Sequence, residues 1–210
     1  MQSPARPQTQ VPVPICEPEK ESIVSKILIA YGTTEGQTAK IADFIAEVVR
    51  GHGHTADAVN VKQSEPGIGG YDAVIVGGSI HMGKHEEYVG DFVRRNRTAL
   101  ERQPSVLFSV SLAAHGDTAN AEAYVGRFEQ ETGWRPAQVG LFAGALLYTQ
   151  YGFFKRQVMK KIVRDKPGNL STDTSRDYVY TEWDDVRAFT ERFLDRLISS
   201  EATEPQQQNA

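Results

Sequence analysis

Short apolar segments that alternate with amphipathic helical patterns constrain the fold of this chain more than any other feature of its sequence. The first segment, Lys26–Tyr31, is almost wholly apolar, as expected of a strand that is buried on both faces. The further strand patterns occupy His54–Val61, Ala73–Gly77, Val106–Val110 and a run that begins at Val139–Phe142. The helical patterns occupy Ala39–Arg50, Glu86–Arg102, Thr118–Thr132 and Glu182–Ile198. Together they predict an α/β fold with a doubly wound, five-stranded parallel sheet that is covered by helices on both faces.

Length and composition indicate one folded domain with a short tail at each end. The chain has 210 residues, of which 40% are hydrophobic and 24% are charged, as in an ordinary globular domain. Residues 1–25 and 201–210 are rich in proline, glutamine and glutamate, and such segments bury too little surface to offset the entropy cost of ordering. We therefore expect disordered tails around a domain at 26–200.

Charge and cysteine content exclude several classes of function. The net charge of −4 provides no broad cationic surface, so nucleic-acid binding is not expected. The single cysteine, Cys16, rules out an intrachain disulfide and a thiolate metal cluster, which fits a reducing cytoplasm. No signal peptide and no membrane-spanning segment are visible, no metal site is expected, and we place the protein in the cytoplasm.

A ligand site in such a sheet is expected beyond the carboxyl ends of the strands, where the strand order reverses. The loops Gly32–Thr38, Ser79–His85 and Ser111–Asp117 follow three of the predicted strands. These segments are called the first, second and third loops below.

The first loop has the composition of a site for a single phosphate group. Two glycines allow a tight turn, the following helix offers free N–H groups, and threonine hydroxyls add donors. The candidate residues are Thr33, Thr34, Glu35, Gly36, Gln37 and Thr38. The loop lacks the lysine of nucleoside triphosphate loops, and no G-x-G-x-x-G dinucleotide motif occurs in the chain. The phosphomonoester of FMN therefore suits the loop best, although a threonine that only caps the helix would explain part of the pattern.

The order of several motifs resembles a known family, the flavodoxin-like, menaquinone-dependent protoporphyrinogen IX dehydrogenases. The motifs are Thr33–Thr38, Gly78-Ser79-Ile80, Phe108–Leu112, Trp134-Arg135-Pro136, Gly144–Tyr151 and Tyr180-Thr181-x-Trp183. The resemblance implies a flavodoxin-like fold with strand order 2-1-3-4-5 and FMN as the cofactor.

This resemblance also implies the reaction, which is the oxidation of protoporphyrinogen IX to protoporphyrin IX in heme biosynthesis. A membrane quinone would accept the electrons, and FMN would carry the chemistry without a dedicated catalytic side chain. The residues expected to frame the flavin ring are Ser79, Ile80, His81, Met82 and Gly83 in the second loop, and Leu112, Ala113, Ala114 and His115 in the third.

The segment 143–181 between the fifth strand and the last helix is too long for an idle loop. Its aromatic and aliphatic residues interleave with lysines and arginines, which predicts a basic amphipathic helix. We expect it to contact a membrane surface or the carboxylates of the substrate through Tyr148, Tyr151, Phe153, Phe154, Lys155, Arg156, Lys160 and Lys161. In the alternative interpretation the apolar stripe packs on the domain and the cations form a solvated face.

Three other functions remain open from the sequence. A one-electron flavodoxin carrier would dock to protein partners, but such carriers usually have a strongly acidic face. The protein would otherwise be an NAD(P)H-dependent quinone reductase, or a binding module that has lost FMN. Hydrolysis is a poor candidate, because no serine lies on a G-x-S-x-G turn.

Overall fold

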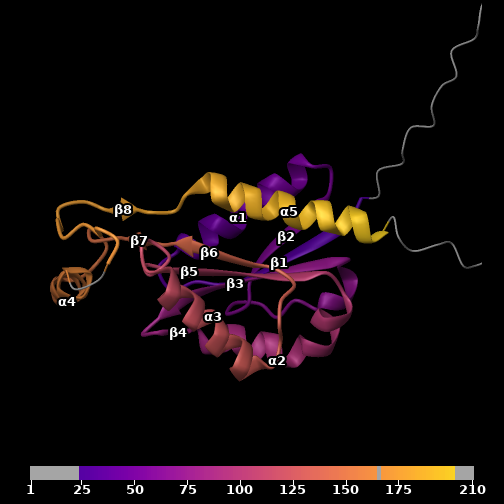
Figure 1. The fold of residues 1–210 in the computed structure, drawn as a ribbon, viewed down its shortest axis with the longest axis horizontal. Coiled ribbons are helices and arrows are strands. Elements are labelled where there is room, and N and C mark those ends of the chain that lie inside the picture. Colours follow the sequence, from indigo (N-terminus) through magenta and orange to yellow (C-terminus); the bar gives the residue numbers. More distant parts are fainter. Residues whose placement is uncertain (1–23, 165–166, 202–210) are drawn as a thin grey trace, which may run out of the picture.

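Five parallel strands form the centre of the computed structural model, which describes residues 24–164 and 167–201 (Figure 1). The strands are β1 (Lys26–Gly32), β2 (Thr55–Asn60), β3 (Ala73–His81), β5 (Ser105–Ser111) and β6 (Val139–Ala143). Their order across the sheet is β2-β1-β3-β5-β6, and all neighbours run parallel. Counted along the chain, this is the order 2-1-3-4-5 that the resemblance implied.

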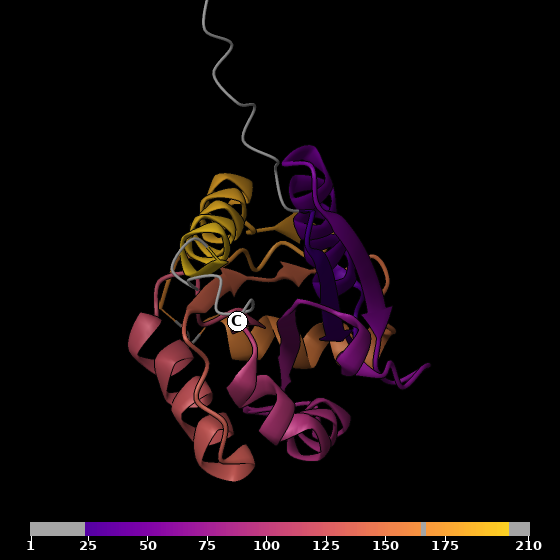
Figure 2. The same ribbon diagram turned by 90° about the vertical axis from the view of Figure 1, so that its right-hand side faces the viewer.

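Two helices cover each face of the sheet, as Figure 2 shows in a view along the strands. On one face lie α1 (Gln37–Gly51) and α5 (Trp183–Glu201), and on the other lie α2 (Glu87–Arg102) and α3 (Thr118–Thr132). The predicted helices are all present, and α3 begins and ends at the predicted residues. The doubly wound α/β fold is therefore confirmed.

Burial on both faces explains why the strand segments are apolar throughout. Ile27 and Ile29 of β1 pack in the core formed with α1 and α5, whereas Leu28 and Ala30 pack in the core formed with α2. All four side chains have 0% exposure. Successive residues of a strand point to opposite faces, so apolar side chains predominate in a strand that is covered on both sides.

The short strands were not visible in the sequence. Strand β3 continues past the predicted end and returns antiparallel as β4 (Lys84–His85). The turn between them consists of Met82 and Gly83, with φ angles of 50° and 81°, as in the two-residue turns of tight hairpins. A 3₁₀ helix (Ile68–Gly70) was also missed. Elements of two or three residues are too short to have a measurable hydrophobic period.

The predicted insertion forms a small folded unit beyond the carboxyl ends of the strands (Figure 1). It contains an antiparallel pair of short strands, β7 (Ala145–Leu146) and β8 (Tyr178–Val179), and the helix α4 (Phe153–Arg164). Its buried core consists of Leu146, Leu147, Tyr148, Tyr151, Val163 and Leu170. Part of the insertion therefore folds on itself, which an unstructured loop would not do.

The predicted tails lie almost wholly outside the described residues. Ser25 is described, and only 1% of its surface is exposed. Its backbone N–H donates to Nδ1 of His54 at 3.2 Å. The ordered part of the domain therefore includes Ser25, one residue before the predicted start.

Two glycines bring the insertion into backbone contact with the third loop. Both have positive φ angles, 92° at Gly116 and 102° at Gly168. A Cβ atom on Gly168 would lie 1.8 Å from the carbonyl oxygen of His115, and one on Gly116 would lie 2.4 Å from Cα of Gly168. Only glycine fits at this contact, which fixes the insertion against the sheet edge.

We expect Gly168→Ala to lower the free energy of unfolding by about 2 kcal/mol or more, because the methyl group meets backbone at a strained φ angle. Denaturant unfolding would measure the change, and limited proteolysis would show whether the insertion loosens. Gly126→Ala in α3 is the matched control, since a Cβ atom there meets nothing within 4 Å. If Gly168→Ala were as stable as the unmodified protein, this contact would not hold the insertion in place.

Candidate functional site

The three predicted loops lie side by side because they follow neighbouring strands. In the sheet register, Gly32 at the end of β1 pairs with Gly78 of β3, and Ser79 of β3 pairs with Val110 of β5. The chain turns from β1 into a helix on one face of the sheet, and from β4 into a helix on the other. The loops therefore meet at the point where the strand order reverses, which is where sheets of this type bind ligands.

The first loop presents the uncapped start of α1. Gly36 adopts a left-handed conformation with φ 88° at the N-cap, and within the described residues no side chain caps the helix. Oγ1 of Thr33 accepts a hydrogen bond from N–H of Gly36 at 2.9 Å, so this threonine closes the loop. Thr34 is exposed, and its hydroxyl donates to the carboxylate of Glu86. The N–H groups of the first helical turn carry partial positive charge and remain available to an anion.

The two helical residues of the first loop are buried, and one of them, Gln37, connects the loop to the carboxyl end of β6. Gln37 is 6% exposed and Thr38 is 2% exposed. Nε2 of Gln37 donates to Oγ1 of Thr181 at 2.9 Å, and this hydroxyl donates to the carbonyl oxygen of Ala143 at 2.7 Å. Among the described residues, Oε1 of Gln37 has no hydrogen-bond partner. Backbone N–H groups rather than these two side chains are thus the main anion donors of the loop.

The second loop forms a hairpin whose inner part is polar and whose tip is exposed. Oγ of Ser79 is buried and finds no hydrogen-bond partner in the described part of the chain. Ile80 and Gly83 are half-buried, His81 is exposed, and Met82 at the tip is 91% exposed. An unpaired hydroxyl of this kind costs free energy, and a polar ligand atom would satisfy it.

The third loop is held by its own hydrogen bonds and by the insertion. Ala113 is buried, and Leu112, Ala114 and His115 are half-buried. N–H of Ala114 donates to Oγ of Ser111 at 3.2 Å, which tightens the turn after β5. The ring of His115 packs on that of Tyr180, with 4.6 Å between the ring centroids. The predicted loop residues are thus grouped at one edge of the sheet, with the insertion beside them.

Three of the residues expected to contact a membrane or substrate hold the insertion together instead. Tyr148 is 0% exposed and Tyr151 is 5% exposed, because both rings lie in the core of the insertion. The guanidinium of Arg156 donates to the carbonyl oxygens of Tyr148 and Tyr151 at 3.0 and 3.1 Å. For these three side chains the expected surface contact is corrected. Tyr148 and Tyr151 precede α4 and form part of the core of the insertion, and Arg156 in α4 donates to their carbonyl oxygens; the sequence pattern did not distinguish these roles from a surface role.

The outer face of α4 is apolar and cationic. Phe153 is 70% exposed and Phe154 is 84% exposed, and the side chains of Val158 and Ile162 extend the same surface. Lys155 and Lys161 are exposed, and Lys160 is half-buried. We call Phe153, Phe154, Val158 and Ile162 the apolar stripe of α4. It has no covering element among the described residues.

One contact at the site could not be found from the sequence. Glu35 of the first loop accepts a hydrogen bond from the hydroxyl of Tyr151 at 2.5 Å and pairs with Nζ of Lys155 at 2.6 Å. Burial raises the pKa of Tyr151, and the hydrogen bond to the Glu35 carboxylate raises it further. Glu35 and Tyr151 are separated by 116 residues, so no local pattern could place them together.

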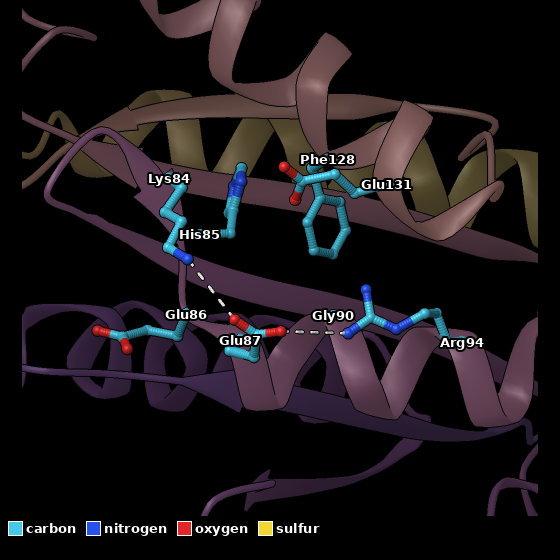
Figure 3. Close-up of a pocket in the computed structure, with 8 residues that line it drawn as sticks. All are labelled: Lys84, His85, Glu86, Glu87, Gly90, Arg94, Phe128 and Glu131. Atoms are coloured by element: carbon cyan, nitrogen blue, oxygen red, sulfur yellow. Dashed lines mark ion pairs between the residues drawn. The ribbon is translucent and has the colours of Figure 1, made fainter.

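A small polar pocket lies beside the hairpin, between α2 and α3 (Figure 3). Figure 3 shows Glu87 between Lys84 and Arg94, at N–O distances of 3.5 and 3.8 Å. The other residues that line the pocket are His85, Glu86, Gly90, Phe128 and Glu131. The pocket has both signs of charge, so it does not favour one kind of ion.

His85, at the wall of this pocket, is a buried and neutral histidine. Its Nε2 lies 2.9 Å from Oγ of Ser109, and its ring packs on Phe128 at 4.6 Å between centroids. Within the described residues its Nδ1 has no partner. Burial lowers the pKa of His85 to about 4, because desolvation disfavours the charged imidazolium.

We expect His85 to make the protein less stable in mild acid. An unfolded histidine takes up its proton near pH 6.5 and His85 in the fold near pH 4, so between these values the unfolded state binds more protons. Above pH 6.5 the neutral His85 makes its full contribution to the free energy of unfolding. Roughly 3 kcal/mol of this free energy is lost as the pH falls toward 4. Denaturant unfolding from pH 7 to pH 4 would show a flatter profile for His85→Gln. His52→Gln, at a half-exposed imidazole, is the control, and equal slopes for both variants would contradict the assignment.

Comparison with known proteins agrees with this geometry. The family described as "Flavodoxin domain" matches residues 28–173. The chain is 35% identical over 168 residues to the protoporphyrinogen IX dehydrogenase [quinone] of Escherichia coli strain K12, covering 78% of this chain and 92% of that protein. It is 34% identical over 173 residues to the protein of the same name from Leishmania major, covering 80% and 74%.

A solved structure supports the fold. A short-chain flavodoxin associated with a bacterial microcompartment superposes with a TM-score of 0.50 at 11% identity, covering 83% of this chain and 99% of that one. At this low identity the likeness concerns the fold alone.

Proposed function

The chain belongs to the flavodoxin-domain family of protoporphyrinogen IX dehydrogenases [quinone], and we propose that it is an FMN-dependent oxidoreductase that oxidises protoporphyrinogen IX to protoporphyrin IX with a quinone as acceptor. The two relatives support the choice of substrate and acceptor. The observation that carries the proposal within this structure is the uncapped start of α1, which lies where the strand order reverses.

The residues at the sheet edge fit FMN in charge and in hydrogen-bonding groups. The N–H groups after Gly36 and the hydroxyl proton of Thr33 suit a terminal phosphate, and the loop has no cation for a triphosphate. Oγ of Ser79 and Oε1 of Gln37 are buried and have no partner in the part of the chain that the structure describes, so a bound molecule would satisfy them. We assign the first loop to the phosphate, and the second and third loops to the flavin ring.

When bound, FMN supplies the two-electron chemistry, so the protein needs to bind, orient and exclude water rather than act as an acid or base. Overall, each round removes two electrons and two protons from the porphyrinogen and converts one quinone to quinol. The hairpin and the third loop form two walls of the site. Gly116 and Gly168 hold the insertion beside those walls.

The reaction can be tested anaerobically with the FMN-loaded protein, protoporphyrinogen IX and a menaquinone analogue. We expect the flavin absorbance to bleach on adding the porphyrinogen, and porphyrin fluorescence to rise as the quinone is consumed. A mixture of porphyrinogen and quinone without protein measures the uncatalysed oxidation. A flavin that stays oxidised with the porphyrinogen but is reduced by NAD(P)H would instead identify a quinone reductase.

We further assign the apolar stripe of α4 to peripheral contact with an anionic membrane, where a lipid-soluble quinone resides. Phe154, Val158 and Ile162 are spaced four residues apart, so they lie on one side of the helix, with the exposed Lys161 nearby. Apolar side chains beside lysines suit the interface between acyl chains and anionic headgroups. No helix among the described residues is long and apolar enough to span a bilayer.

Replacing Phe153, Phe154 and Ile162 together by serine should weaken binding to phosphatidylglycerol liposomes at least about tenfold, because each buried apolar side chain contributes roughly 1.5–3 kcal/mol. Co-sedimentation would measure the binding, and FMN content should stay unchanged. Ile198→Ser is the control, because Ile198 is 54% exposed on α5, outside the stripe. Unchanged liposome binding in the triple variant would disprove the assignment of this stripe to a membrane.

A further inference from the structure

The first loop contains a charge that opposes the ligand proposed for it. Glu35 is the only charged residue in Gly32–Thr38, and it is an anion in a segment assigned to a phosphate dianion. Like charges at short range repel, and the loop itself has no cation to offset Glu35. The charge of Glu35 therefore needs compensation from another part of the chain.

Both oxygens of Glu35 are engaged by the insertion. Oε2 accepts the hydroxyl of Tyr151, and Oε1 lies 2.6 Å from Nζ of Lys155. The same ammonium lies 4.5 Å from the ring centroid of Tyr151, so the three side chains form one cluster. The position of Tyr151 is fixed, because its ring is buried and its hydroxyl accepts N–H of Leu147 at 3.3 Å.

The position of Lys155 in its own helix also indicates that this lysine compensates the charge of Glu35. Lys155 lies in the first turn of α4, which contains no acidic residue. A cation is unfavourable at a helix N-terminus, because the N–H groups there already carry partial positive charge. The helix therefore gives no reason for a lysine at this position, whereas Glu35 does.

We propose that Lys155, oriented by Tyr151, supplies the countercharge that the first loop lacks, so that the insertion sets the affinity for the phosphate group of FMN. This inference rests on the proposed function and makes Lys155 and Tyr151 positioning residues of the cofactor site. The side chains of Lys155 and Glu35 are 46% and 29% exposed, so salt screens the pair in part. By linkage, bound FMN also stabilises the docked insertion.

Riboflavin separates this role from a merely structural one, because it has the same ring as FMN and no phosphate. The full-length protein, stripped of flavin, is titrated with each molecule, and quenching of flavin fluorescence gives both dissociation constants. In Lys155→Ala the constant for FMN should rise about fivefold to tenfold, with a change below about twofold for riboflavin. Lys155→Arg should restore most of the FMN affinity, because it keeps the charge.

Lys161→Ala is the matched control, since it removes the same charge from the same helix at a position without an ion-pair partner among the described residues. It should leave both dissociation constants unchanged. Equal weakening of FMN and riboflavin by Lys155→Ala, or no weakening of FMN, would overturn the inference and leave the proposed function intact.

A second variant tests the charge itself. Adding Glu35→Gln to Lys155→Ala removes the uncompensated anion, so FMN affinity should recover to within about threefold of the unmodified protein. If FMN binding stayed as weak as in Lys155→Ala, the countercharge explanation would be wrong. An unmodified protein that bound neither flavin would instead refute the proposed function itself.

Discussion

The burial of β1, β3 and β5 on both faces of the sheet is the constraint on which the rest of the molecule depends. A parallel strand covered by helices on both sides needs apolar residues at nearly every position, as Ile27, Leu28, Ile29 and Ala30 show. The chain can then expose polar backbone only where these strands end. Because parallel strands end at the same edge, the loops that bind ligands come together there without specific contacts between them.

The insertion is a second folded unit beside the carboxyl ends of the strands. It has its own core around Tyr148 and Tyr151, and it meets the sheet edge at two places. One is the backbone contact between Gly116 and Gly168, and the other is the cluster of Glu35 with Tyr151 and Lys155. Both contacts join segments that bear on the proposed cofactor site, so the insertion belongs to that site as well as carrying an exposed helix. Its inner face contacts the first and third loops, while the apolar stripe of α4 on its outer face is exposed.

Much of the fold could be predicted from the sequence, because its signals are local. Helix α3 matches its predicted range, and the strand patterns gave the five parallel strands. Short strands such as β4 and β7 were not predicted, because two residues show no hydrophobic periodicity. The tight turn of the first loop could be predicted from its glycines and threonines, because their conformational and hydrogen-bonding properties are intrinsic to those residues. The assignment of Tyr148, Tyr151 and Arg156 to a surface was wrong because a mixture of aromatic and basic residues does not reveal which of them form the core and the internal hydrogen bonds of the insertion.

The sequence by itself determined the doubly wound sheet, the positions of the three loops and the tight strand-to-helix turn of the first loop. These follow from hydrophobic periodicity and from glycine and threonine at a strand-to-helix turn, which act within a few residues of one another. The tertiary structure alone decided that Lys155 of the insertion meets the first loop, that the buried hydroxyl of Ser79 has no partner among the described residues, and that His85 is neutral. Each of these depends on burial and on distances between residues far apart in the chain, and only the packed fold sets those quantities.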